Sequence, residues 1–112
     1  MSVVGSSSDG SLADISDAAQ LAAATASGKV SVIYFTAPWC QNCRKITTAV
    51  SNLPSQYPNI SFFKVNTAQA EVLGQENNID VLPTFVFFRA GSRIGEYKGS
   101  NLEQLIPILK GF

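Results

Sequence analysis

The two cysteines of this chain, Cys40 and Cys43, are separated by two residues in the stretch Trp39-Cys40-Gln41-Asn42-Cys43. An apolar run typical of a buried strand precedes the pair, and a helical pattern follows it. Residues i and i+3 of a helix have Cα atoms about 5 Å apart, within the range that a disulfide requires. A thiolate at Cys40 would face the positive end of that helix, which lowers a thiol pKa and favours nucleophilic attack. The pair is therefore predicted to be redox-active.

Three other roles for the pair remain open from the residues alone. A purely structural disulfide would close only a four-residue ring and would constrain little of the unfolded chain. A zinc site usually takes four protein ligands, and this sequence has two cysteines and no histidine, so we expect no metal. The third alternative is a pair of inert cysteines in the core. The redox pair is favoured over all three.

Composition restricts the classes of function. The chain of 112 residues fits one domain, and its eight basic and eight acidic residues give no net charge. Nucleic acid and anionic membrane are therefore not expected as partners, and no apolar run approaches the ~20 residues of a membrane span. No Lys or Arg precedes Lys29, unlike a secretory or mitochondrial leader. We expect a cytoplasmic location, with an organelle reached after removal of a transit peptide as the alternative.

The elements before and around the cysteines follow from their periodicity. Residues 1–10 are rich in Ser and Gly and are expected to be a flexible tail, followed by one domain over residues 11–112. An edge strand near 11–15, a helix from Ala18 capped by Ser16, and a central strand over Val30–Phe35 come next. In the cysteine helix, Cys43 shares the inward stripe while Cys40 stands at an exposed start. One sulfur could then attack and the sheltered one resolve.

The second half of the chain predicts a parallel strand, a hairpin and a final helix. The strand covers Ile60–Val65, and a helix over Ala68–Asn77 capped by Thr67 connects it to the hairpin. The hairpin turns at Ala90-Gly91-Ser92. Ser100 to Glu103 reads as a capping box that starts the last helix, where Pro107 should produce a kink or an end.

Three features together resemble the thioredoxin family: Trp39-Cys40-x-x-Cys43 after a buried strand, Leu82-Pro83-Thr84 about forty residues later, and a hairpin followed by Gly99. The resemblance covers residues 11–112. It implies a thioredoxin fold, an α/β architecture in which a central mixed sheet with an antiparallel hairpin is flanked by helices on both faces. It also implies a thiol–disulfide oxidoreductase that reduces protein disulfides through Cys40 as nucleophile and Cys43 as resolving cysteine.

The same resemblance implies a substrate surface. Pro83 should be cis and pack against the disulfide, and the backbone beside it should pair with a bound substrate strand. The matching surface here consists of Trp39, Leu82, Pro83 and the loop at Gly99. The redox group would be the Cys40–Cys43 disulfide itself, with no bound cofactor. The expected partners are disulfide-containing proteins and an upstream thiol reductase, and the chain is expected to be a monomer.

The sequence departs from the family pattern beside the cysteines. Gln41-Asn42 replaces the usual Gly-Pro, and Tyr34 stands where a buried Asp is expected. That carboxylate is thought to help deprotonate the resolving cysteine, and a buried Tyr cannot act as a base near pH 7. Lys64 matches the lysine that accompanies the Asp and is then expected to lack its partner. Gln41, Asn42, Tyr34 and Lys64 are therefore candidate tuning residues.

These departures keep three other functions open. A protein of the same fold could act as an oxidase or isomerase, since the direction of exchange depends on the reduction potential. The missing Asp could indicate a binding module with weak redox activity. A cluster-binding dimer using Cys40 and an external thiol is disfavoured, because no glutaredoxin-like Gly-Gly follows the strand after Pro83.

Overall fold

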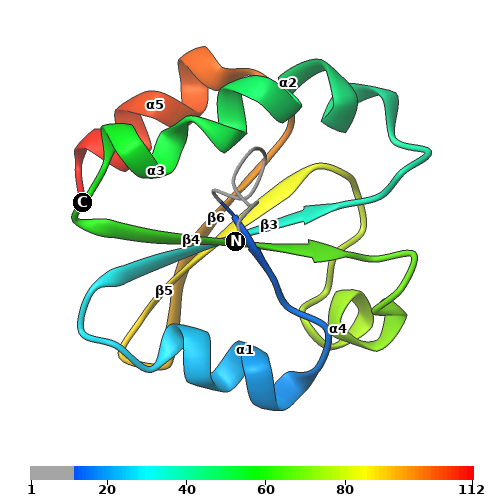
Figure 1. Cartoon of the computed structure of the whole chain (residues 1–112), viewed down its shortest axis with the longest axis horizontal. Coiled ribbons are helices and arrows are strands. Elements are labelled where there is room, and N and C mark those ends of the chain that lie inside the picture. Colours follow the sequence, from blue (N-terminus) through cyan, green and yellow to red (C-terminus); the bar gives the residue numbers. More distant parts are fainter. Residues whose placement is uncertain (1–11) are drawn as a thin grey trace, which may run out of the picture.

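The computed structural model describes residues 12–112 of the chain, so the tail predicted for residues 1–10 lies outside the described residues. Its elements follow the predicted order with one additional short helix (Figure 1). In chain order they are β2 (Ala13–Asp14), α1 (Ala18–Thr25), β3 (Val30–Thr36), α2 (Gln41–Ser51), α3 (Leu53–Gln56), β4 (Ile60–Asn66), α4 (Glu71–Glu76), β5 (Thr84–Arg89), β6 (Ser92–Lys98) and α5 (Leu102–Lys110).

The strands of the described residues form one mixed five-stranded sheet in the order β2-β4-β3-β5-β6. The central strand β3 pairs in parallel with β4 and antiparallel with β5, while β5 and β6 form the predicted hairpin. At the far edge, β2 pairs in parallel with β4, and Asp14 is opposite Lys64 in the register. The expected combination of parallel strands and an antiparallel hairpin is confirmed.

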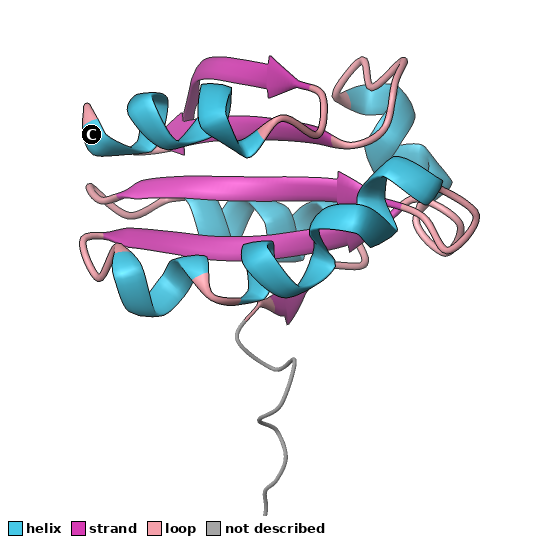
Figure 2. Cartoon of the chain, turned by 90° about the horizontal axis from the view of Figure 1, so that it is seen from above, coloured by secondary structure: helices cyan, strands magenta, loops and turns pink. Residues whose placement is uncertain are grey.

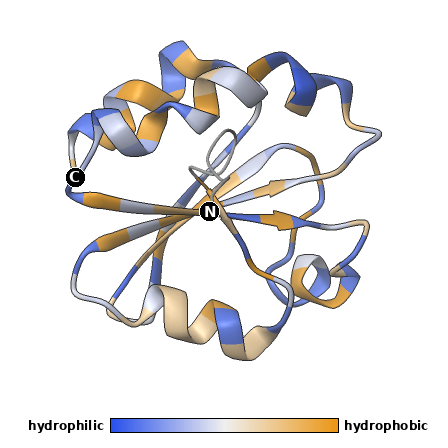
Figure 3. Ribbon diagram, viewed as in Figure 1, coloured by the Kyte–Doolittle hydropathy of each residue, from blue (hydrophilic) through white to orange (hydrophobic). Residues whose placement is uncertain are grey.

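Helices cover both faces of the sheet, and each face has its own apolar cluster (Figures 1 and 2). Helices α2, α3 and α5 pack over one face, where Tyr34, Cys43 and Leu105 belong to the same buried cluster. Helices α1 and α4 lie on the other face, where Ile33, Phe35 and Leu73 are buried together. Hydrophobic and hydrophilic residues alternate along the helices above the sheet, as an amphipathic helix on a sheet requires (Figure 3).

Strand β3 is central because its side chains are apolar on both faces, as predicted. Val32 and Tyr34 point to the α2 side, and Ile33 and Phe35 to the α1 side. All four side chains are at most 5% exposed. The central strand ends at Thr36. The loop that carries the cysteines therefore begins at the C-terminal end of this strand.

Three details of the predicted helices were wrong. The cap of α1 is Asp17, whose carboxylate accepts the backbone N–H of Gln20 at 2.8 Å, instead of Ser16. Helix α4 begins at Glu71 with no side-chain cap, rather than at Ala68 with a Thr67 cap. The side-chain oxygen of Asn66 accepts a hydrogen bond from the N–H of Ala68 at 2.9 Å and forms a turn there. Because of this turn, the helix begins later in the sequence than predicted.

The last helix also differs from its prediction in its start, and it passes through its proline. Asn101, not Ser100, caps α5, and its side chain accepts the N–H of Glu103 at 2.9 Å. The helix does not end at Pro107 but continues to Lys110. Leu109, which is 1% exposed, is buried beyond the proline and anchors the final turn to the sheet. No helix of residues 12–112 has the length and apolar character needed to cross a membrane.

Candidate active site

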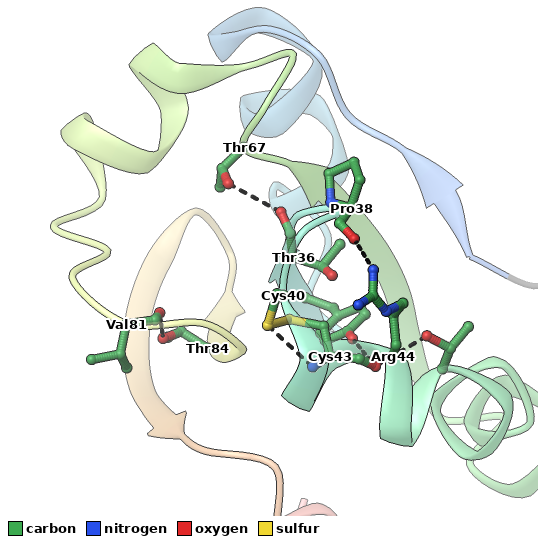
Figure 4. Close-up of a disulfide and its surroundings, with 10 residues drawn as sticks. Thr36, Pro38, Cys40, Cys43, Arg44, Thr67, Val81 and Thr84 are labelled. Carbon is green, nitrogen blue, oxygen red and sulfur yellow. Dashed lines mark hydrogen bonds between the residues drawn. A yellow bond between two sulfur atoms is a disulfide. The ribbon is translucent and has the colours of Figure 1, made fainter.

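Cys40 is the residue that caps helix α2. Its backbone is extended, and its Sγ accepts a hydrogen bond from the backbone N–H of Cys43 at 3.1 Å. The Cα atoms of the two cysteines are 5.2 Å apart, and their sulfurs form a disulfide (Figure 4). A polar N–H at the helix start is thus aimed at the sulfur of Cys40. In the reduced state this donor and the helix N-terminus stabilise negative charge on that sulfur.

The two cysteines differ in exposure, but less than the sequence suggested. Cys43 is 1% exposed, as expected for the inward stripe of α2, whereas Cys40 is 9% exposed and is therefore nearly buried. The prediction of an exposed Cys40 was wrong. Cys40 belongs to the apolar cluster of the α2 face, and Leu82 packs against that cluster. Cys40 nevertheless lines a surface groove that Cys43 does not reach.

The groove at Cys40 has a volume of about 530 Å³ and runs between the cysteine loop, α4 and the segment before Pro83. Trp39 lines it with 66% of its surface exposed, and Val81 with 46%. Large apolar side chains are rarely this exposed unless they serve a contact with another molecule. Trp39 is therefore not a core residue, and Leu82 lines the same groove.

The segment before β5 is fixed by its backbone. The Leu82–Pro83 peptide bond is cis, as the family resemblance implied, and Pro83 is buried. The carbonyl of Pro83 accepts the backbone N–H of Gly99 at 3.0 Å, which joins this segment to the loop after β6. Thr84 donates its hydroxyl to the carbonyl of Val81 at 2.7 Å, and both residues lie beside the disulfide in Figure 4.

Tyr34 lies beneath α2, where the sequence placed it. It is 5% exposed, its hydroxyl donates to the backbone carbonyl of Cys43 at 3.3 Å, and its ring stacks on Phe85 with centroids 4.9 Å apart. Burial raises the pKa of the Tyr34 phenol, and a hydrogen bond with Thr36 offsets part of that rise. Tyr34 is therefore neutral near pH 7 and brings no base to Cys43.

Lys64 does not lack a partner, contrary to the prediction. Its ammonium lies 3.9 Å from the carboxylate of Asp14, with the two side chains 33% and 67% exposed. The reason is the register of the edge strand, which sets Asp14 of β2 beside Lys64 of β4. Both residues line a cavity of about 390 Å³ that also touches Tyr34 and Cys43. A carboxylate therefore lies near Lys64, but at the rim of the cavity and not beneath the cysteine.

Other contacts hold the cysteine loop and were missed from the sequence. Arg44 donates to the carbonyl of Pro38 at 2.6 Å, across the turn that precedes Cys40. Thr67 donates both its N–H and its hydroxyl to the carbonyl of Thr36, at 2.8 and 3.1 Å. Figure 4 draws the contact between Arg44 and Pro38 and the contact between the Thr67 hydroxyl and Thr36. They join residues that carry no recognisable motif, so only the folded chain reveals them.

The other two predicted tuning residues lie on the surface of the chain. Gln41 and Asn42 are exposed in the first turn of α2, where they could influence the disulfide through solvent and the helix terminus. Among residues 12–112, no group of three or more His, Cys, Asp or Glu side chains could hold a metal ion.

Comparisons with known proteins agree with this geometry. The thioredoxin family model matches residues 14–110. A thioredoxin of Callithrix jacchus is 33% identical over 99 residues, which cover 88% of this chain and 94% of that protein. The crystal structure of Fasciola hepatica thioredoxin, 28% identical, superposes with a TM-score of 0.85 and covers 89% of this chain and 98% of its own.

A third comparison concerns the fold alone. The oxidized mitochondrial thioredoxin 3 of Saccharomyces cerevisiae is 24% identical and superposes with a TM-score of 0.87, covering 93% of this chain and 98% of that chain. The chain is thus a thioredoxin homologue with a Cys-x-x-Cys disulfide, the redox group of a dithiol–disulfide oxidoreductase. Because the family model spans nearly all of the described residues, this chain belongs to the thioredoxin family.

Proposed function

We propose that this protein-disulfide reductase uses Cys40 as the attacking thiol and Cys43 as the resolving thiol. The observation that carries the proposal is the different surroundings of the two sulfurs. Cys40 lines the groove beside the exposed Trp39, whereas Cys43 is 1% exposed and lies against Tyr34. A protein disulfide can approach the groove, whereas the side chain of Cys43 is buried and does not line it.

The proposed reaction has two exchange steps. The Cys40 thiolate attacks one sulfur of the substrate disulfide, the substrate S–S bond breaks, and one substrate thiolate leaves and is protonated by water. The thiol of Cys43 then loses its proton to water in the adjoining cavity and attacks the sulfur of Cys40. The mixed disulfide breaks, and the second substrate thiolate leaves and takes up a proton. Two electrons pass to the substrate, and the Cys40–Cys43 disulfide remains.

The contacts at Cys40 suit the first step. The N–H of Cys43 is 3.1 Å from the sulfur of Cys40, so a hydrogen bond is already directed at the charge that the reduced form carries. Substrate backbone would be held beside Trp39, Leu82, Pro83 and Gly99 by pairing with the segment before β5. The hydrogen bond from the N–H of Gly99 to the carbonyl of Pro83 fixes the two segments of this surface relative to each other.

Membership of the family implies protein substrates and an upstream reductase that restores the dithiol. We propose that the chain works as a monomer, in which residues of one chain line the groove at Cys40. A reducing compartment such as the cytoplasm suits this activity, since thiols are kept reduced there. Residues 11–112 would form the functional domain.

A trapping experiment tests the order of attack. The reduced Cys43→Ser variant should accumulate mixed disulfides with oxidised protein substrates, because Cys40 can attack but no thiol resolves the product. The Cys40→Ser variant is the matched control and should accumulate almost none. Mass spectrometry of the thiol-blocked products identifies the linked cysteine. Equal accumulation by both variants would overturn the assignment.

The reduction potential of the Cys40–Cys43 couple tests whether the protein reduces or oxidises its substrates. Equilibration of the Cys40–Cys43 couple with glutathione buffers gives its reduction potential. A potential below that of the cytosolic glutathione pool supports a reductase, and a potential near that of the strong oxidants of the fold supports the oxidase or isomerase alternative. Reduction of insulin by the dithiol form is the corresponding activity assay.

A further inference from the structure

The groove at Cys40 combines an apolar surface with charge of a single sign. Its apolar part includes the exposed Trp39 and Val81. Its charged side chains, Glu71 and Asp80, are both carboxylates that lie on the surface. Helix α4, which begins with Glu71, stands beside the sheet edge from which the cysteine loop leaves (Figure 1). A substrate segment that reaches Cys40 must therefore pass next to negative charge.

Only one of these carboxylates is compensated by a neighbouring cation. Asp80 accepts a hydrogen bond from the ammonium of Lys98 at 2.9 Å, and this pair lowers the pKa of Asp80 and raises that of Lys98. Lys98 also lies 3.8 Å from the carboxylate of Glu96, and Glu96 pairs with Arg93, so two carboxylates and two cations leave this group without net charge. Glu71 forms no ion pair with any residue from 12 to 112.

The opposite side of the disulfide carries the other sign. The cavity that touches Cys43 has three charged lining residues, Asp14, Arg44 and Lys64, whose sum is +1. Figure 4 shows the segment with Val81 on one side of the disulfide and Arg44 on the other. The face around the cysteines is therefore electrically asymmetric, and the acidic side coincides with the attacking sulfur.

From this placement we propose that the groove selects disulfide substrates that carry Lys or Arg beside the attacked cysteine, and that Glu71 is the residue that sets this preference. The proposal rests on the proposed attack by Cys40. The occupant is an extended segment of the substrate protein, whose apolar side chains contact Trp39 and Val81 while its cation lies near Glu71. Charges at the rim of a binding site act mainly on the association rate and are weakened by salt.

The test uses two otherwise identical peptide disulfides, one with Lys and one with Glu flanking the cysteine. Pre-reduced protein is mixed rapidly with each peptide, quenched with acid, and the released peptide thiol is quantified by mass spectrometry. The ratio of the two second-order rate constants is divided by the same ratio for dithiothreitol. This correction removes the intrinsic difference in reactivity between the peptides.

The variants Glu71→Gln and Glu71→Lys change the groove, and Glu76→Gln is the matched control. Glu76 ends the same helix but does not line the groove. We expect a corrected Lys-to-Glu ratio above one for the unmodified chain, a decrease of about two- to fivefold in Glu71→Gln, and a larger decrease in Glu71→Lys. The Glu76→Gln ratio should stay unchanged, and about 0.5 M salt should reduce the preference of the unmodified chain.

The outcomes separate this inference from the proposed function. The Glu peptide should react as fast or faster with Glu71→Gln, a result that partial unfolding could not produce. Unchanged ratios in both Glu71 variants, with normal rates, would overturn the role of Glu71 and leave the reductase proposal intact. Failure of the unmodified chain to reduce either peptide would overturn both.

Discussion

The hydroxyl of Tyr34 donates a hydrogen bond to the backbone carbonyl of Cys43 at 3.3 Å, which ties the central strand to the first turn of α2. The same carbonyl accepts the hydroxyl of Thr47 at 3.0 Å. Tyr34 therefore supports the helix that carries both cysteines, but it supplies no charge to the thiol that must be deprotonated. Substitutions of Tyr34 can therefore separate its support of helix α2 from any effect on proton transfer from Cys43.

Alkaline pH should reveal the burial of Tyr34. Its folded-state pKa lies above the ordinary value of 10.0, mainly because of burial, so the folded chain holds the phenol proton more tightly than the unfolded chain. This contribution to stability is complete below about pH 10 and is lost as the pH rises through the folded-state pKa. Chemical denaturation at increasing pH should therefore show a steeper fall for the unmodified chain than for Tyr34→Phe. Equal slopes would show that the phenol is not protected.

Tyr34→Asp should accelerate resolution and destabilise the fold. The substitution removes a ring stacked on Phe85 and buries a carboxyl, which together cost about 3 kcal/mol or more. A carboxylate near Cys43 could accept its proton, and Lys64, which lines the same cavity, could stabilise the charged form. The rate to measure is the release of substrate from a preformed mixed disulfide on Cys40.

The matched control for that experiment is Tyr34→Asn, which has nearly the same size as Asp but cannot accept a proton. Resolution should be faster with Asp than with Asn, while both variants should attack a substrate disulfide at similar rates. If Asp and Asn give the same resolution rate in folded protein, the missing carboxylate is not what limits this chain.

The central strand, the hairpin and the cysteine pair could be predicted because their signals are local. The apolar run of Val30–Phe35 fixes the central strand, Ala90-Gly91-Ser92 fixes the hairpin, and the spacing of Cys40 and Cys43 fixes their side of a helix. Each depends on residues a few positions apart, where backbone periodicity alone decides which side chains meet.

The contacts that the sequence did not show depend on distant register or on competition between neighbouring polar residues. Asp14 meets Lys64 only because β2 aligns beside β4, fifty residues later. The carboxylates of the groove come from α4 and from the loop after it, which approach Cys40 only in the folded chain. At the helix starts, adjacent residues can each cap, and the tertiary path of the chain selects Asp17 over Ser16 and Asn101 over Ser100.

Gly99→Ala should destabilise the loop that supports Pro83. Gly99 has a φ of +135°, and a Cβ added there would lie 3.1 Å from the hydroxyl of Tyr97, so both the backbone and the contact oppose a side chain. A loss of about 1–3 kcal/mol is expected in chemical denaturation. Gly28→Ala is the control, since a Cβ at Gly28 meets nothing within 4 Å. A similar small effect of both substitutions would contradict this account.

Thr84→Val should loosen the segment that presents Leu82 and Pro83 to a substrate. The side chain of Thr84 is 0% exposed, and its hydroxyl donates a hydrogen bond to the carbonyl of Val81 at 2.7 Å. Valine keeps the size and branching of threonine but leaves that carbonyl without its donor, which should cost about 1 kcal/mol in denaturation. The same change should slow the attack on a protein disulfide, because the backbone that pairs with substrate is then less ordered. Thr84→Ser keeps the hydroxyl and is the control for the attack rate. An attack rate in Thr84→Val equal to that of the unmodified chain, or an equal loss in Thr84→Ser, would show that this hydrogen bond does not order the substrate surface.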